Sequence, residues 1–127
     1  MMTGNHQKLL QAESLTKWFP VGGLFGRGKQ FVHAVDGVNL SIESGETLAL
    51  VGESGSGKST IGRLVLGLLP PTGGTVKWKG RDISSLNKRE RQQIRAEMQI
   101  IFQDTLLSLN PRKTIRRILS EPLQLHD

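Results

Sequence analysis

The stretch VGESGSGKST, residues Val51 to Thr60, decides the fold class of this chain. It follows the apolar run TLALV, residues 47–51, which turn residues bound and which we predict to be a buried strand. After it, apolar residues recur at helical spacing at positions 61, 64, 65, 68 and 69, and Pro70-Pro71 would end that helix. The predicted local structure is therefore a strand, a glycine-rich loop and an amphipathic helix.

Residues Gly52 to Ser59 fit the pattern G-x-x-x-x-G-K-[ST]. Its glycines would let backbone N–H groups approach triphosphate oxygens, because they have no Cβ and accept positive φ. Lys58 would reach the β/γ-phosphates, Ser59 would offer a hydroxyl to Mg²⁺, and the positive end of the helix dipole would face the phosphates. The predicted mononucleotide site comprises Gly52, Glu53, Ser54, Gly55, Ser56, Gly57, Lys58, Ser59 and Thr60. A flexible connector between strand and helix is the alternative interpretation.

Composition limits the other classes of function. The 127 residues include no Cys, which excludes disulfides and thiolate metal sites, and the three His residues have no ligand spacing. The net charge of +6 is typical of nucleic-acid or anionic-membrane binding, or of solvated helix faces. No aromatic RNA-binding signature accompanies the basic residues. The polar start MMTGNHQK is unlike a signal peptide, and no apolar run approaches the roughly 18 residues of a membrane span.

Further elements follow from local patterns. We predict a strand at residues 9–19, a loop at 20–30, and a turn at Asp36-Gly37 between two extended stretches. Residues 72–83 predict a turn and a short strand with Val76 and Trp78 on one face. Asn87 and Glu90 predict a capped helix over 87–98. Residues 98–103 read as a second strand, and a helix is expected after Pro111.

Residues 34–83 together resemble the first half of an ABC transporter ATP-binding subunit. IIFQD, residues 100–104, resembles that family's Q-loop, and SLNPRKTI, residues 108–115, is similar to the oligopeptide, dipeptide and nickel importer branch. EPL, residues 121–123, and the glycine-rich insertion GGLFGRGK, residues 22–29, fit the same branch. The resemblance implies an α/β fold, a P-loop NTPase core with an antiparallel β subdomain, present incompletely. We expect residues 1–8 to be a flexible tail and residues 9–127 to be the N-terminal part of the ATP-binding domain.

The resemblance also implies roles for single residues, with ATP and Mg²⁺ as cofactors. Phe19 matches the aromatic residue that stacks on adenine, with Trp18 as runner-up and ordinary core packing as the alternative. Gln103 matches the Q-loop glutamine, which contacts Mg²⁺ or the attacking water, although a polar strand end would look alike. The implied catalytic residues are thus Lys58 and Gln103, and the implied metal ligands are Ser59 and Gln103. The family more often has Tyr at the adenine position, and residues 105–107 depart from its usual Q-loop continuation.

Other family motifs do not occur in residues 1–127. There is no LSGGQ-type signature, no apolar run ending in Asp-Glu, and no switch histidine, and His126 is misplaced for that role. The chain therefore reads as an N-terminal fragment or truncated product, and whether it hydrolyses ATP is left open. The family's partners would be permease subunits, a second ATP-binding subunit and, indirectly, a substrate-binding protein, at the cytoplasmic side of the membrane and without nucleic acid. A stand-alone P-loop NTPase or kinase, and a non-hydrolytic nucleotide- or nucleic-acid-binding fragment, stay as alternatives.

Overall fold

The computed structural model describes residues 8–21, 30–103 and 109–126. The expected loop at 20–30 and the expected tail at 1–8 lie largely outside these ranges. The chain divides into two compact units, Met1–Leu86 and Asn87–Asp127, and each is described by itself. No helix among the described residues is long and apolar enough to cross a membrane.

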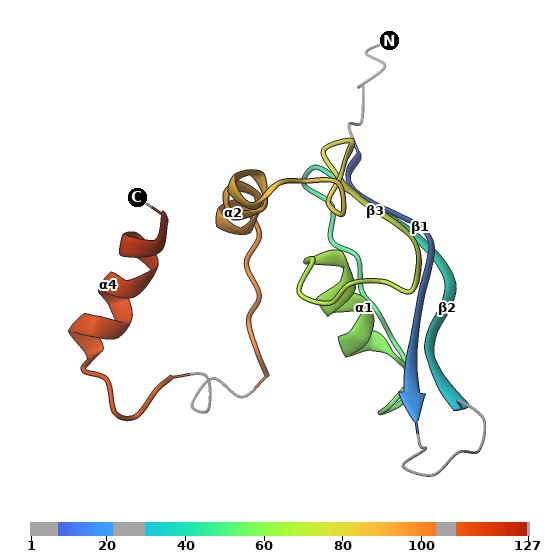
Figure 1. The fold of residues 1–127 in the computed structure, drawn as a ribbon, viewed down its shortest axis with the longest axis horizontal. Helices are drawn as coiled ribbons and strands as arrows, with labels where there is room; N and C mark the ends of the chain where they lie inside the picture. Colours follow the sequence, from blue (N-terminus) through green and yellow to red (C-terminus); the bar gives the residue numbers. More distant parts are fainter. Residues whose placement is uncertain (1–7, 22–29, 104–108, 127) are drawn as a thin grey trace. The chain divides into compact units, whose positions relative to one another are not determined.

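The first unit is built on an antiparallel sheet (Figure 1). Its strands are β1 (Lys8–Val21), β2 (Gln30–Glu43), β3 (Gly73–Trp78) and β4 (Arg81–Asp82), in the order β2-β1-β3-β4. The predicted strands at 9–19 and around Val76 are thereby confirmed. Lys79 and Gly80 both have positive φ, as the tight turn between β3 and β4 requires. β1 is the strand that joins the two hairpins.

The long β1–β2 hairpin is irregular at its centre. Leu15 pairs with Val38 and Lys17 with Val35, so β2 has an extra residue at the position where a turn was predicted. That prediction is wrong, because Gly37, at φ +63°, forms a bulge inside one continuous strand. The Gly37 N–H donates to Thr16 Oγ1 at 3.1 Å. A second bulge, at Ser14 in β1, is held by donation from the Ser14 N–H to Asn39 Oδ1 at 2.8 Å.

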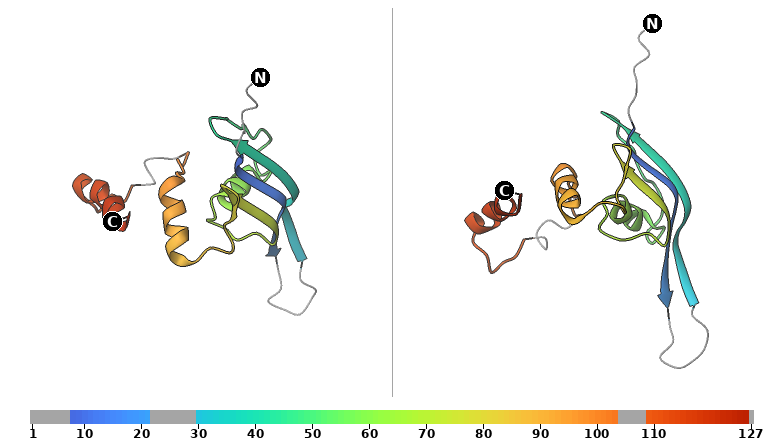
Figure 2. Two further views of the ribbon diagram at one scale, coloured as in Figure 1. Left: turned by 90° about the horizontal axis from the view of Figure 1, so that it is seen from above. Right: turned by 45° about the horizontal axis from the view of Figure 1, so that its top comes forward.

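Helix α1 (Lys58–Val65) lies on one face of this sheet, as Figures 1 and 2 show. Leu64 of α1, Leu15 of β1 and Val76 of β3 have fully buried side chains and form the centre of the unit's core. The sequence predicts that this helix continues to Pro70, but its last helical residue is Val65 and Leu66 is its C-cap. Gly67, at φ +64°, donates its N–H to the carbonyl of Leu64, so a glycine in the left-handed conformation ends the helix before the prolines.

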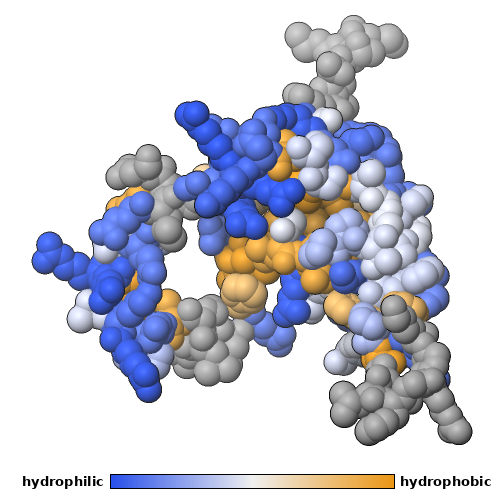
Figure 3. Space-filling view, in the orientation of Figure 1, coloured by the Kyte–Doolittle hydropathy of each residue, from blue (hydrophilic) through white to orange (hydrophobic). Residues whose placement is uncertain are grey.

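The predicted buried strand at 47–51 is not formed. These residues are irregular and exposed, with 41% of Leu48 and 95% of Val51 accessible. A strand needs a partner to complete its backbone hydrogen bonds, and among the described residues no segment pairs with this run. Figure 3 shows the resulting apolar surface around α1.

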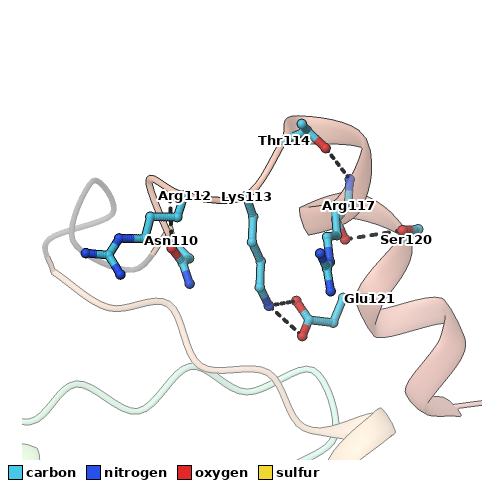
Figure 4. A network of polar contacts seen from close by, with 7 residues as sticks. All are labelled: Asn110, Arg112, Lys113, Thr114, Arg117, Ser120 and Glu121. Carbon is cyan, nitrogen blue, oxygen red and sulfur yellow. Dashed lines mark hydrogen bonds and ion pairs between the residues drawn. The ribbon is translucent and has the colours of Figure 1, made fainter.

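The second unit contains α2 (Lys88–Glu97) and α4 (Ile115–His126). The predicted start of α2 is confirmed: Glu90 N–H donates to Asn87 Oδ1 at 3.0 Å, and Asn87 N–H donates to Glu90 Oε2 at 2.9 Å. The helix expected after Pro111 is present, and Lys113 Nζ donates to both carboxylate oxygens of Glu121 in it (Figure 4). The strand predicted at 98–103 is wrong; the run is irregular and Ile101 is 85% accessible, again without a pairing strand among the described residues.

Candidate functional site

The candidate site is the Gly52–Ser59 loop, which leads into α1. Within it, the Ser56 N–H donates to the carbonyl of Glu53 at 3.2 Å and closes a turn. A Cβ on Gly52 would lie 2.7 Å from Ser56 Oγ, so the loop folds back close to its own start. Glu53, Ser54 and Ser56 are exposed. The sequence motif therefore forms a compact, closed loop with polar side chains at the surface.

Gly57 allows this loop to pack closely against the sheet. It stands at the N-cap of α1 in the left-handed conformation, at φ +92°. A Cβ at this position would clash with the carbonyl oxygen of Ala34 and would lie 3.7 Å from Val35 Cγ2, both in β2. Only glycine satisfies both the backbone conformation and the close approach. The loop is thus fixed to the middle of β2 by contact between main chains.

Lys58 folds back over the loop. Its Nζ donates to the carbonyl of Gly52 at 2.7 Å, to Ser56 Oγ at 3.1 Å and to the carbonyl of Glu53. These three acceptors use all three ammonium donors. The side chain is half-buried, so the positive charge is held at the loop and does not extend into solvent. An anion bound at the loop would meet this ammonium directly.

The N-terminus of α1 adds unpaired donors next to Lys58. The first helical hydrogen bond runs from the Ile61 N–H to the carbonyl of Gly57 at 2.9 Å. In this part of the described chain, no side chain caps the helix and its first turn contains no acidic residue. Since a helix N-terminus leaves N–H groups free and carries the positive end of the dipole, this end favours an anion. The exposed Ser59 and half-buried Thr60 present hydroxyls in the same turn.

The pairing register shifts between Lys17 and Trp18, but the extra residue is in β2. Side chains of β1 therefore continue to alternate, and Phe19 and Trp18 lie on opposite faces of this strand. Lys17 pairs with Val35, whose side chain points toward Gly57, and Lys17 Nζ lies 5.3 Å from the centroid of the Phe19 ring. Phe19 therefore shares the face that the loop occupies. Trp18 is on the other face, stacked on His33 with ring centroids 4.3 Å apart. This placement separates two neighbouring aromatic residues that the sequence could not separate.

Two residues that the sequence motif does not include also lie at the site. Ala34 contributes only its carbonyl, so nothing in its side chain could have indicated the contact. Lys17 could have been found from its spacing of two residues from Phe19 in a strand.

Gln103 belongs to the second unit and is exposed at a bend. The first unit therefore holds Phe19 and the loop but not Gln103. Across the described ranges, no group of three His, Cys, Asp or Glu side chains could hold a metal ion. A divalent ion at this site would need oxygen ligands from a phosphate together with few protein groups, as Mg²⁺ commonly has.

Comparisons with known proteins agree with this geometry. The chain is 46% identical over its full length to the oligopeptide transport ATP-binding protein AppF of Bacillus subtilis. It is 41% identical over 91% of its length to the nickel import ATP-binding protein NikE of Escherichia coli O157:H7. It covers 39% and 43% of those proteins, so it spans about two fifths of the length of these relatives.

Solved structures give the same result for the fold. A dimeric structure of MJ0796, described as a bacterial ABC transporter cassette, matches with a TM-score of 0.74 and 29% identity. The match covers 93% of this chain and 48% of that one. A post-hydrolysis structure of the same cassette, bound to ADP and Pi, matches with a TM-score of 0.71. The ABC transporter family model matches residues 35–124, and the chain belongs to the ABC transporter family, with the fold of its P-loop ATPase cassettes.

Proposed function

We propose that this chain binds ATP through the Gly52–Ser59 loop, as part of the nucleotide-binding subunit of a peptide- or nickel-type ABC importer. The observation that carries the proposal is the placement of Lys58. Its ammonium is held over the loop by three acceptors, beside the uncapped N-terminus of α1. A half-buried cation and free N–H donors together suit a phosphate chain better than a neutral ligand.

Each residue of the site then has a physical role. Backbone N–H groups of the loop and of the first turn of α1, up to Thr60, would bind phosphate oxygens. Lys58 would exchange its acceptors in the loop for oxygens of the β- and γ-phosphates, which carry more negative charge than carbonyls. Ser59 has an exposed hydroxyl, an oxygen donor of the kind that Mg²⁺ takes, so the donor set fits this ion. Phe19, on the loop side of β1, would stack on adenine.

Mg²⁺, when bound with the nucleotide, would neutralise charge on the phosphates. Gln103 would be a second oxygen ligand or would orient the attacking water. Residues 1–127 contain no Asp-Glu pair at the end of an apolar run. Hydrolysis coupled to transport is proposed for the assembled transporter, on the similarity to ATP-binding proteins of peptide and nickel import.

The partners proposed for that assembly follow from the relatives. They are permease subunits, a second ATP-binding subunit and, indirectly, a substrate-binding protein. Peripheral attachment at the cytoplasmic side of the membrane follows from binding to permeases. Nucleic acid is not among the proposed partners, because the positive charge at the site is concentrated at a loop that suits a triphosphate.

The test is titration of a fluorescent ATP analogue with and without Mg²⁺. Lys58→Ala should weaken binding at least tenfold, because a charge-assisted hydrogen bond contributes about 1.5–3 kcal/mol. Ser59→Ala should reduce mainly the Mg²⁺-dependent part. Lys88→Ala is the matched control, because Lys88 is also the first residue of a helix, and its affinity should not change. Equal affinities of Lys58→Ala and the unmodified chain would overturn the proposal.

A further inference from the structure

We infer that Lys17 is a positioning residue that holds Phe19 as a one-sided platform for the adenine base. The inference rests on the proposed function and adds a residue to the same site. Lys17 is the second residue before Phe19 in β1, and both side chains lie on the face that carries the loop and α1. Lys17 is not part of the phosphate-binding motif.

The ammonium of Lys17 is tethered by a main-chain acceptor. Lys17 Nζ donates to the carbonyl of Pro70 at 2.7 Å, and Pro70 lies in the segment between α1 and β3. From this position the same nitrogen lies over the ring of Phe19, 5.3 Å from its centroid. The Lys17 side chain is half-buried, which limits its freedom further. The cation is therefore held above one particular face of the aromatic ring.

This arrangement closes one face of Phe19 to a base. A base between the ring and the ammonium would need about 3.5 Å on each side, or roughly 7 Å in total. The observed distance is 5.3 Å, so adenine can reach only the opposite face. Adenine would then be bound on a single side of the ring, with the ring fixed from behind.

The cation also makes stacking on the open face more favourable. Two aromatic faces repel each other through their negative quadrupoles when they stack directly. An ammonium draws the electrons of the ring toward itself, since cation and ring face attract each other. The opposite face becomes less negative, and its repulsion of the adenine π-system falls. Lys17 thus acts on the base through Phe19 and not by touching the nucleotide.

The experiment compares ATP with inorganic tripolyphosphate, which has the phosphates but no base, by calorimetric titration of the chain. Lys17→Met keeps the length of the side chain and removes the charge. It should weaken ATP binding about two- to fivefold, the range expected for an exposed cation–π contact, and leave tripolyphosphate binding unchanged. Lys17→Arg should retain affinity for ATP, because it retains a cation over the ring. Lys8→Met, at the far end of β1, is the control for net charge and should change neither affinity.

A second comparison tests whether Lys17 acts through Phe19. In a Phe19→Ala background, Lys17→Met should have no further effect on ATP binding. Three results for Lys17→Met would each overturn the inference. They are an equal loss of affinity for ATP and tripolyphosphate, the same loss of ATP affinity with Phe19 and with Ala at position 19, and an unchanged affinity for ATP. Should Lys17→Met lower the unfolding temperature substantially, Lys17→Arg decides, because loss of ATP affinity in that variant contradicts the inference. Failure of the proposed function is distinct: Lys58→Ala and the unmodified chain would then bind ATP equally, whatever stands at position 17.

Discussion

Gly57 packs directly against the main-chain carbonyl of Ala34, so the loop before α1 and strand β2 meet without an intervening side chain. The contact fixes where the helix begins relative to the sheet. It also makes Gly57 different from Gly55 in the same loop. Both have positive φ, but a Cβ on Gly55 would have nothing within 4 Å.

Gly57→Ala should therefore destabilise the chain more than Gly55→Ala. The left-handed conformation alone costs a non-glycine residue about 1–2 kcal/mol, which is the loss expected for Gly55→Ala. The clash with Ala34 should raise the loss for Gly57→Ala to roughly 2–4 kcal/mol. The measurement is the free energy of unfolding in urea. Equal losses in the two variants would show that the approach to Ala34 is not close in solution.

Phe19→Ala should weaken binding of ATP about fivefold or more, because stacking of a base on an aromatic ring contributes about 1–3 kcal/mol. Trp18→Ala should have a smaller effect, since Trp18 stacks on His33 on the other face of β1. Both affinities come from the same nucleotide titration. If Trp18→Ala had the larger effect, the assignment of the adenine platform to Phe19 would be wrong.

Loss of the capping box should destabilise the second unit. Asn87→Ala leaves the Glu90 N–H without its acceptor, and a lost N-cap costs about 1 kcal/mol. Glu90→Ala should also destabilise α2, because the Asn87 N–H loses its side-chain acceptor. Hydrogen exchange of the amides in α2 measures the loss of stability in both variants. Gln93→Ala, at an exposed position in the helix interior, is the control and should not speed exchange. Unchanged exchange in Asn87→Ala would contradict the cap.

The Lys113–Glu121 pair should give α4 a stability that depends on pH. The hydrogen bond from Lys113, and secondarily its charge, lower the pKa of Glu121 below its ordinary value. A carboxylate with a lowered folded pKa contributes stability above its unfolded pKa, and this contribution is lost as pH falls through the folded pKa. The difference in unfolding free energy between the unmodified chain and Glu121→Gln should therefore shrink as pH falls below about 4.

Titration of the Glu121 carboxyl carbon by NMR checks this prediction directly. In Lys113→Met the pKa of Glu121 should return toward its ordinary value, because the hydrogen bond and the positive charge of Lys113 both disappear. A Glu121 pKa at or above the ordinary value in the unmodified chain would show that the pair does not persist in solution.

The parts of this fold that sequence predicts well are those that neighbouring residues determine. Asn87 and Glu90 complete their cap within four residues, and Gly57 and Lys58 belong to a loop whose geometry is local. The predictions of strands at 47–51 and 98–103 were wrong, because a strand depends on a distant partner that its own residues do not encode. Asp36-Gly37 predicts a turn but lies in a bulge, since the same two residues favour both structures. The predicted strand at 9–19 implies that Lys17 and Phe19 share a face, but nothing in its residues indicates that the Gly52–Ser59 loop lies on this face.

The strand order has a consequence for synthesis of the chain on the ribosome. β1 pairs with β2 on one edge, and its other edge receives β3. Since β3 begins at Gly73, that second edge stays open while everything from Ser44 to Thr72 is translated. An open strand edge is a template for unwanted pairing with other chains. The Gly52–Ser59 loop and α1 are translated in this interval, so the candidate phosphate-binding loop is made before the sheet beneath it is closed.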